Sequence, residues 1–75
     1  MKNEIKEIMA KVFELEISKI NDDASQENTI QWDSLNQLNL MVEIEDHFDI
    51  SFTPEQIGSM VSLNEICTQI EKLKR

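Results

Sequence analysis

The first apolar residues of the chain recur at the spacing of one face of an α-helix. They follow the i, i+3, i+4, i+7, i+8 pattern and are Ile5, Ile8, Met9, Val12 and Phe13. This pattern predicts a first amphipathic helix over residues 3–15. We expect its apolar face to belong to the core and to carry no site.

The helical period is lost between residues 17 and 32, a stretch rich in Asn, Asp, Ser and Gln. This stretch is predicted to be a long loop, in which Ile20 and Ile30 are isolated apolar anchors. Loops of this length are uncommon in compact domains unless they serve a function. The end of this loop is therefore the first place to look for a functional residue.

A second helix is predicted over residues 34–48. At about 100° per residue, one of its faces is apolar. That face holds Leu38, Met41, Ile44 and Phe48, with Leu40 at its edge. We expect it to be buried.

Two apolar residues of this helix do not fit the buried face. Leu35 and Val42 fall on the opposite side, together with Asn39, Glu43 and Asp46. Packing in the core does not explain why these two residues are apolar. We therefore expect Leu35 and Val42 to be exposed.

The next segment carries clear helix-start signals. Ile50 and Phe52, in a short connection, are expected to anchor to the core. Thr53 is a hydroxyl cap, followed by Pro at the first helical position and by Gln56 three residues after the cap. A short third helix is predicted near residues 54–60.

A second capping box, Ser62-Leu63-Asn64-Glu65, starts a last helix that is predicted to end at about Lys74. Its apolar stripe consists of Leu63, Ile66, Cys67, Ile70 and Leu73. No segment shows a convincing strand pattern. The prediction is an all-α fold, a small four-helix bundle with a long first loop and a short third helix, in one domain over residues 1–75.

Charge is unevenly distributed in this chain, whose net charge is −8. All seven Lys and Arg lie at positions 2–19 or 72–75, which leaves residues 20–71 with acidic residues and no Lys or Arg. An anionic surface of this kind repels nucleic acid and steers basic protein surfaces toward it. No apolar run reaches the length of about 18 residues that a membrane span needs. We expect a cytoplasmic protein whose partners are basic.

Catalysis has little support in the sequence. The chain has one His, one Cys and no Tyr, and it is short for a pocket that excludes water. Asp46 and His47 are adjacent, but neighbouring helix positions point about 100° apart, and no nucleophile is placed to complete a triad. We therefore expect no catalytic residues.

A dedicated metal site is not expected either. Asp22, Asp23 and Glu27 lack the ligand spacing, the central Gly and the terminal Glu of a calcium-binding EF-hand loop. Cys67 lies in an apolar helical stripe, so it is interpreted as a core residue and not as a reactive thiol.

The remaining feature is Gln31-Trp32-Asp33-Ser34-Leu35, where the long loop meets the second helix. The first turn of a helix offers unpaired backbone N–H groups and the positive end of the helix dipole. A phosphodiester at Ser34 would be stabilised there, and Asp33 can cap the helix. By itself, an Asp-Ser-Leu tripeptide more often does no more than start a helix.

The wider context strengthens this motif. Trp32-Asp33-Ser34-Leu35 is followed by Glu43-Ile44-Glu45-Asp46-His47-Phe48 and then by Ile50-Ser51-Phe52-Thr53-Pro54. This order resembles the acyl carrier protein family across nearly all 75 residues. The resemblance implies a cytoplasmic, monomeric four-helix carrier. Its serine, here Ser34, is esterified with 4′-phosphopantetheine by a phosphopantetheinyl transferase that uses coenzyme A, and Asp33 matches the motif aspartate.

The resemblance also implies how such a carrier works. The arm ends in a thiol that holds acyl or aminoacyl groups as thioesters, and loading and processing enzymes dock basic patches on the second helix. Leu35 and Val42 match apolar positions that family members present to partners. Asn39, Glu43 and Asp46 lie on the same partner-binding face.

Several residues depart from the pattern of carriers for bulk fatty acid synthesis. Asn36 and Asn39 stand where those carriers commonly have acids. Trp32 replaces a small residue, as in specialised carriers that serve secondary-metabolite, polysaccharide or lipid-modifying enzymes. The simpler interpretation of Trp32, as an anchor of the loop on the core, is favoured. Two alternatives stay open: an aminoacyl or peptidyl carrier, and an acidic helical interaction module that is never modified.

Overall fold

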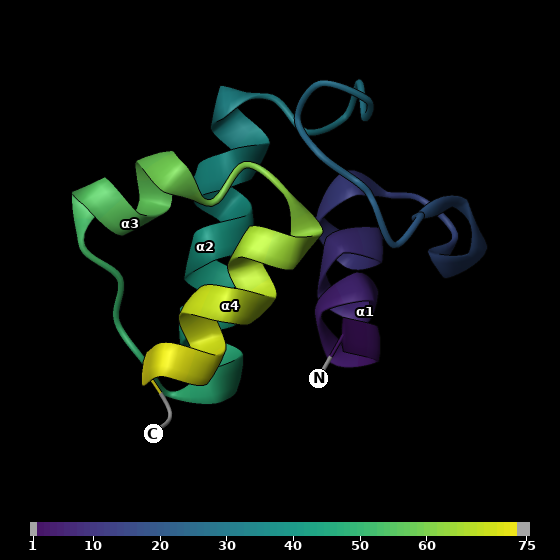
Figure 1. Ribbon diagram of the computed structural model, residues 1–75. Coiled ribbons are helices and arrows are strands. Elements are labelled where there is room, and N and C mark those ends of the chain that lie inside the picture. The colour runs from purple at the N-terminus through teal and green to yellow at the C-terminus, as the bar shows by residue number, and fades with distance from the viewer. Residues whose placement is uncertain (1, 74–75) are drawn as a thin grey trace.

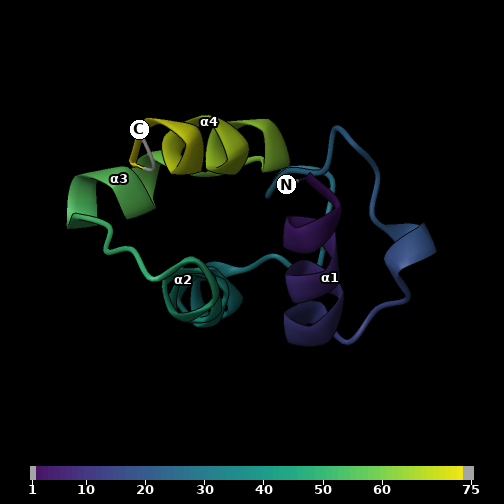
Figure 2. The same cartoon turned by 90° about the horizontal axis from the view of Figure 1, so that it is seen from below.

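The computed structural model describes residues 2–73. Its elements, in chain order, are α1 (Lys2–Phe13), the short 3₁₀ helix η1 (Ile17–Lys19), α2 (Ser34–Phe48), α3 (Pro54–Ser59) and α4 (Leu63–Leu73). The longer helices α1, α2 and α4 surround one core, and α3 bridges α2 and α4 on one side (Figure 1). Viewed along α2, the pair α3 and α4 forms one layer and α1 closes another side (Figure 2). The all-α prediction of four helices with a short third helix is confirmed.

The helix α1 buries Ile5, Met9 and Phe13 against the other helices. It ends two residues earlier than the pattern predicts. Glu14 adopts a left-handed conformation with φ 56°, and the N–H of Leu15 donates to the Ala10 carbonyl at 3.0 Å. A left-handed residue with such a bond is a common way to close a helix C-terminus.

The long loop between α1 and α2 is fixed to the rest of the molecule at several points. Lys6 of α1 pairs with Asp22, and Ser25 forms an isolated antiparallel bridge with Ser62, the nearest approach to strand structure in residues 2–73. Ile20 is buried, as predicted. The short helix η1 inside the loop was not predicted.

Ile30 is not a core anchor, and this prediction is wrong. Its side chain is almost wholly exposed, whereas Trp32 is buried in its place. The N–H of Trp32 donates to the Thr29 carbonyl at 3.0 Å, which closes a turn with Ile30 at its corner. The indole packs against Phe13, with ring centroids 5.7 Å apart, so the large ring fills the space that Ile30 was expected to fill.

The buried face of α2 differs from the prediction at positions 37 and 38, and Phe48 at its end is half-buried against the core. Leu40, Met41 and Ile44 are buried, but Leu38 is exposed and Gln37 is buried instead. Gln37, Leu40, Met41 and Ile44 follow the i, i+3, i+4, i+7 pattern, so a polar residue completes the stripe. Leu38 then points about 100° away from the centre of that stripe.

The connection to α3 and its N-terminus follow the prediction. Phe52 is buried and Ile50 packs against the core. Thr53 accepts a bond from the N–H of Gln56 at 3.1 Å, and the Gln56 side chain accepts one from the N–H of Thr53 at 2.8 Å. This reciprocal capping box fixes the start of a helix that is too short to be stable by itself.

The last helix, α4, buries Leu63, Ile66 and Ile70. At its start, Ser62 accepts from the N–H of Glu65 at 3.2 Å, but its hydroxyl donates to the Glu65 carboxylate, so the predicted capping box is formed only in part. Cys67 is half-buried, and burial raises the pKa of its thiol. The predicted end at Lys74 lies outside the described residues. Within residues 2–73, none of the helices has the length and apolar character needed to cross a membrane.

Candidate functional site

Ser34 is the first residue of α2, and its side chain is exposed. The preceding Asp33 has an extended backbone, and its carboxylate accepts a bond from the N–H of Asn36 at 2.8 Å. Asp33 therefore caps the helix, as a side chain at this position commonly does. The hydroxyl of Ser34 lies at the positive end of the α2 dipole.

This position fits a covalently bound phosphate group. The free N–H groups and the dipole at a helix N-terminus stabilise negative charge. Within residues 2–73, no hydrogen bond is recorded for the hydroxyl of Ser34, so esterification would break none there. The side chain opens to solvent, which leaves room for a long flexible substituent.

Two buried side chains hold the segment around Ser34. The indole N–H of Trp32 donates to the side-chain oxygen of Gln37 at 2.5 Å. The amide nitrogen of Gln37 donates in turn to the carbonyls of Ile57 at 2.8 Å and Met60 at 3.0 Å, at the end of α3. Trp32 is thus an anchor of the loop on the core, one of the two interpretations that the sequence allows.

Gln37 was missed by the sequence analysis. One signal could have revealed it, because it stands at the first position of the stripe that continues with Leu40, Met41 and Ile44. A residue on the buried stripe of a helix is buried whatever its polarity, and a buried amide must find hydrogen-bond partners.

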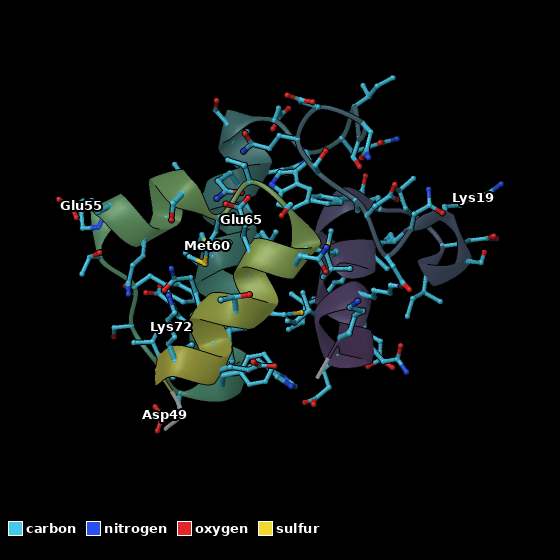
Figure 3. The ribbon with its side chains drawn as sticks, viewed as in Figure 1. Lys19, Asp49, Glu55, Met60, Glu65 and Lys72 are labelled. Carbon is cyan, nitrogen blue, oxygen red and sulfur yellow. The ribbon has the colours of Figure 1, made fainter. Side chains whose placement is uncertain are left out.

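Met60, whose carbonyl is one of the partners of Gln37, is itself buried among the helices. The side chains of Lys19, Asp49 and Glu55, in contrast, point away from the body of the molecule (Figure 3).

The two asparagines of the first turns of α2 form a short ladder of hydrogen bonds. The side-chain amide of Asn36 donates to the Gln31 carbonyl at 2.7 Å, and that of Asn39 donates to the Asn36 side chain at 3.3 Å. A carboxylate in place of Asn36 could not donate to a carbonyl. Asn36 therefore contributes to holding the loop against α2, which an acid at this position would not do.

The predicted partner-binding residues are mostly exposed. Leu35, Asn39, Val42 and Asp46 are exposed on the side of α2 that faces away from the core. Glu43 differs, because it is half-buried and lies 3.6 Å from Lys11 of α1. Lys11, Val12, Asn39, Val42 and Glu43 line a hollow of about 290 Å³ between α1 and α2.

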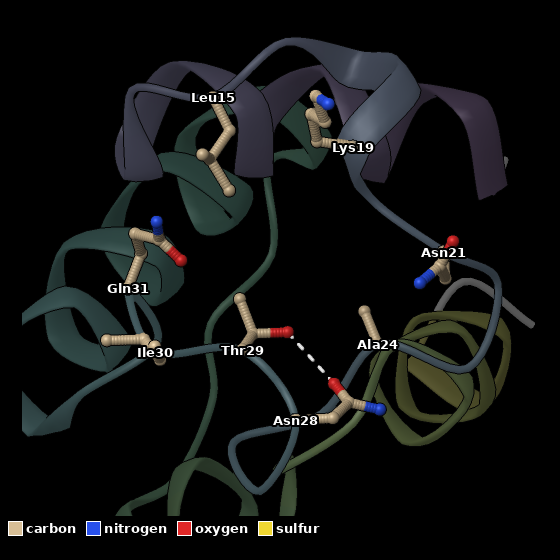
Figure 4. A pocket seen from close by; sticks show the side chains of 8 residues that line it. All are labelled: Leu15, Lys19, Asn21, Ala24, Asn28, Thr29, Ile30 and Gln31. Carbon is tan, nitrogen blue, oxygen red and sulfur yellow. Dashed lines mark hydrogen bonds between the residues drawn. The ribbon is translucent and has the colours of Figure 1, made fainter.

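A second hollow, of about 320 Å³, lies beside the loop that leads to Ser34. Leu15 and Ala24 give it an apolar lining, and Ile30 and Gln31 stand at the edge nearer to α2 (Figure 4). Thr29 and Asn28, which are hydrogen-bonded to each other at 2.9 Å, form part of its rim. Polar side chains form the rest of its lining, and the hollow is open to solvent.

The single histidine joins two helices. Nε2 of His47 lies 3.0 Å from a carboxylate oxygen of Glu4, and this hydrogen bond lowers the pKa of Glu4. Asp46 is exposed and does not take part in that contact. In the part of the chain that the structure describes, no three or more His, Cys, Asp or Glu side chains are grouped to hold a metal ion.

Comparison with known proteins adds two findings. Residues 3–70 match a family model described as a phosphopantetheine attachment site. The fold is similar to the solved structure of a protein described as an acyl carrier protein from Mycobacterium tuberculosis, with a TM-score of 0.82 over 96% of this chain and 97% of that chain, at 19% sequence identity. At that identity the likeness establishes the fold alone. A comparison with curated proteins gave no match.

Proposed function

Since the chain belongs to the phosphopantetheine-attachment family of carrier proteins, we propose that Ser34 is the serine that bears its 4′-phosphopantetheine arm. Covalent 4′-phosphopantetheine is the cofactor of this family, whose members are carriers and not catalysts. The observation that carries the proposal is the exposed hydroxyl of Ser34 at the N-terminus of α2, next to the capping Asp33. This arrangement combines access for a modifying enzyme with a helix end that favours a phosphodiester.

Other serines are less suitable. The hydroxyls of Ser59 and Ser62 are engaged in hydrogen bonds at 3.0 and 3.1 Å, and Ser25 accepts from the N–H of Asn28. Ser18 and Ser51 are exposed, but neither is the first residue of a helix: Ser18 lies within the three-residue η1, and Ser51 lies in the connection two residues before Thr53, the cap of α3. These differences support Ser34 as the attachment residue.

The cargo is proposed to be an acyl group. When attached, the arm supplies a terminal thiol that holds a carboxylic acid as a thioester. The order of motifs around and after Ser34, which resembles that of acyl carrier proteins, supports this choice, and an aminoacyl or peptidyl cargo is the alternative. Ser34 lies at the end of a helix, and the loading enzyme is proposed to select the cargo.

The partners are proposed to be a phosphopantetheinyl transferase and acyl-loading and acyl-processing enzymes that dock basic patches on α2. Leu35 and Val42 supply apolar contacts, and Asn39, Glu43 and Asp46 supply polar and acidic ones. The net charge of −8 supports this assignment, because an anionic surface steers basic proteins toward it. Residues 1–75 are proposed to act as one monomeric carrier domain in the cytoplasm.

The pathway is proposed to be a specialised one and not bulk fatty acid synthesis. Trp32 and Asn36 support this, because each makes a hydrogen bond that a small or acidic residue could not make. Both bonds hold the end of the loop beside Ser34, and the resemblance implies that carriers of bulk synthesis have other residues at these two positions.

The test is incubation with coenzyme A and a promiscuous phosphopantetheinyl transferase, followed by intact-mass measurement. The wild-type chain is expected to gain the mass of one arm, Ser34→Ala none, and Ser51→Ala, the control, as much as wild type. Absence of any gain in wild type, or an equal gain in Ser34→Ala, would reject the assignment and favour an unmodified interaction module. Loading of the modified protein with fatty acids and with amino acids then separates an acyl carrier from an aminoacyl carrier.

A further inference from the structure

The exposed apolar residues of the chain are concentrated around Ser34. Among the large apolar side chains of residues 2–73, the four most exposed have exposed fractions of 94% (Ile30), 69% (Leu35), 62% (Val42) and 56% (Leu38). The next, Ile17, is at 43%. Single exposed apolar residues are ordinary, but a group of them around one position marks an interaction surface.

Ile30 is held in a defined place relative to Ser34. It occupies the corner of the turn that the bond from the Trp32 N–H to the Thr29 carbonyl closes. Buried Trp32 fixes one side of this turn, and the bond from Asn36 to the Gln31 carbonyl ties it to α2. Four residues of extended chain span at most about 14 Å, so Ile30 lies within about that distance of Ser34. Figure 4 shows Ile30 and Gln31 on the segment that leads to α2.

Leu38 belongs to a continuous apolar strip on the outer side of α2. It lies three residues after Leu35 and four before Val42, a spacing that places the three side chains next to one another. The inner side of the helix is occupied by the buried stripe that begins at Gln37. Packing of the core therefore does not explain why the three residues of this strip are apolar.

We propose that Ile30 and Leu38 are contacts for the enzyme that acts at Ser34, whose apolar surface covers Ile30 on the loop side and the strip Leu35–Leu38–Val42 on the helix side. This inference rests on the function proposed above. Because Ile30 is fixed by its turn, little conformational freedom is lost when it is covered. The sequence between residues 20 and 71 has no Lys or Arg, so the occupant carries basic groups around its apolar contact. A second copy of this chain would instead bring two surfaces of the same charge together.

The test compares Ile30→Ser and Leu38→Gln with Ile17→Ser, a matched control that removes an exposed isoleucine outside this surface. The reaction is loading by a promiscuous phosphopantetheinyl transferase with coenzyme A, followed by intact mass at several carrier concentrations. We expect KM for the carrier to rise roughly tenfold in Ile30→Ser and Leu38→Gln, which corresponds to about 1.4 kcal/mol of binding. The value of kcat, the mass gained on complete loading and the melting temperature are expected to stay as in wild type, and Ile17→Ser is expected to match wild type in these values and in KM.

The outcomes separate this inference from the proposed function. If wild type is loaded at Ser34 but Ile30→Ser and Leu38→Gln have the KM of Ile17→Ser, the inference is overturned and the proposed function stands. If wild type gains no arm, the proposed function fails and the inference with it. If analytical ultracentrifugation shows a wild-type dimer that Ile30→Ser dissociates, the surface belongs to a second copy and the inference is wrong.

Discussion

The indole of Trp32 and the side-chain amide of Gln37 are joined by a buried hydrogen bond of 2.5 Å, and Ser34 lies between them in sequence. The amide nitrogen of Gln37 also donates hydrogen bonds to the carbonyls of Ile57 and Met60 at the end of α3. One side chain thus holds together the loop before Ser34, the first turns of α2 and the short helix α3. The position of Ser34 depends on this polar connection as well as on the apolar core.

Replacement of Gln37 by Ala is expected to lower the free energy of unfolding by about 2–4 kcal/mol. The change removes the partner of the Trp32 N–H and of the Met60 carbonyl, whereas the Ile57 carbonyl keeps its bond from the Met60 N–H at 3.4 Å. Each unpaired buried group costs about 1–3 kcal/mol before relaxation or entry of water. Urea unfolding measures the loss. The control Gln31→Ala removes an exposed amide and is expected to stay within about 0.5 kcal/mol of wild type.

Local consequences distinguish this role from general destabilisation. Hydrogen exchange in Gln37→Ala is expected to accelerate most at α3, whose end loses two bonds. Trp32→Phe removes the indole N–H together with part of the buried ring that packs on Phe13, and the double-mutant cycle with Gln37→Ala separates the two losses. We expect the two substitutions to be coupled by about 1 kcal/mol. Additive effects would show that the two side chains act independently.

The sequence was sufficient to place α2, because the helical spacing of its apolar residues and the capping Asp33 indicate the same first residue. It was not sufficient to identify its buried face. Leu38 is apolar and Gln37 is polar, so hydrophobicity alone assigns them to the wrong sides. The choice is decided by hydrogen-bond partners outside α2, the carbonyls at the end of α3 and the indole of Trp32, which the hydrophobicity of the two residues does not show.

The same limit applies to the loop before Ser34. Ile30 and Trp32 are both suitable core residues, and only one can occupy the space beside Phe13. The turn from Thr29 to Trp32 decides in favour of the larger ring, which also finds a hydrogen-bond partner. The cap at Asp33, in contrast, follows from a local rule of helix capping, and Ser34 became a candidate because the order of motifs after it resembles a known family.

The contact between Lys6 and Asp22 predicts a dependence of stability on pH. The hydrogen bond and the charge of Lys6 hold the pKa of Asp22 below its ordinary value of 3.8. Because this pKa is lower in the folded state than in the unfolded state, the stabilisation is fully present above the unfolded value. It is lost as the pH falls from about 5 through the depressed pKa.

Asp22→Asn is accordingly expected to have a lower melting temperature than wild type at pH 7. The difference in melting temperature between the two proteins is expected to shrink as the pH falls toward 3. Thermal unfolding between pH 7 and pH 3 measures it. Asp23→Asn, the control, removes the same charge from the neighbouring residue without removing the Lys6 contact. If the two variants have the same melting temperature at every pH, the contact of Asp22 contributes nothing to stability.

Lys11 is expected to compete with partners for Glu43. Its ammonium group lies 3.6 Å from the Glu43 carboxylate, on the rim of the hollow that Val42 also lines. A basic partner that docks on this face of α2 must displace Lys11 or share the carboxylate with it. Exposed ion pairs of this kind are worth about 0.2–1 kcal/mol. Removing the pair should therefore strengthen partner binding by roughly the same amount.

Lys11→Gln is thus expected to lower KM for the transferase by up to about fivefold, with little change in stability. Lys19→Gln makes the same change in net charge at an exposed position in η1, so it measures the contribution of overall charge alone. The difference between the two variants should shrink at high salt, where exposed charges are screened. Equal KM values for the two variants at low salt would show that Glu43 is not a partner contact, and the proposed face of α2 would then be confined to its other residues.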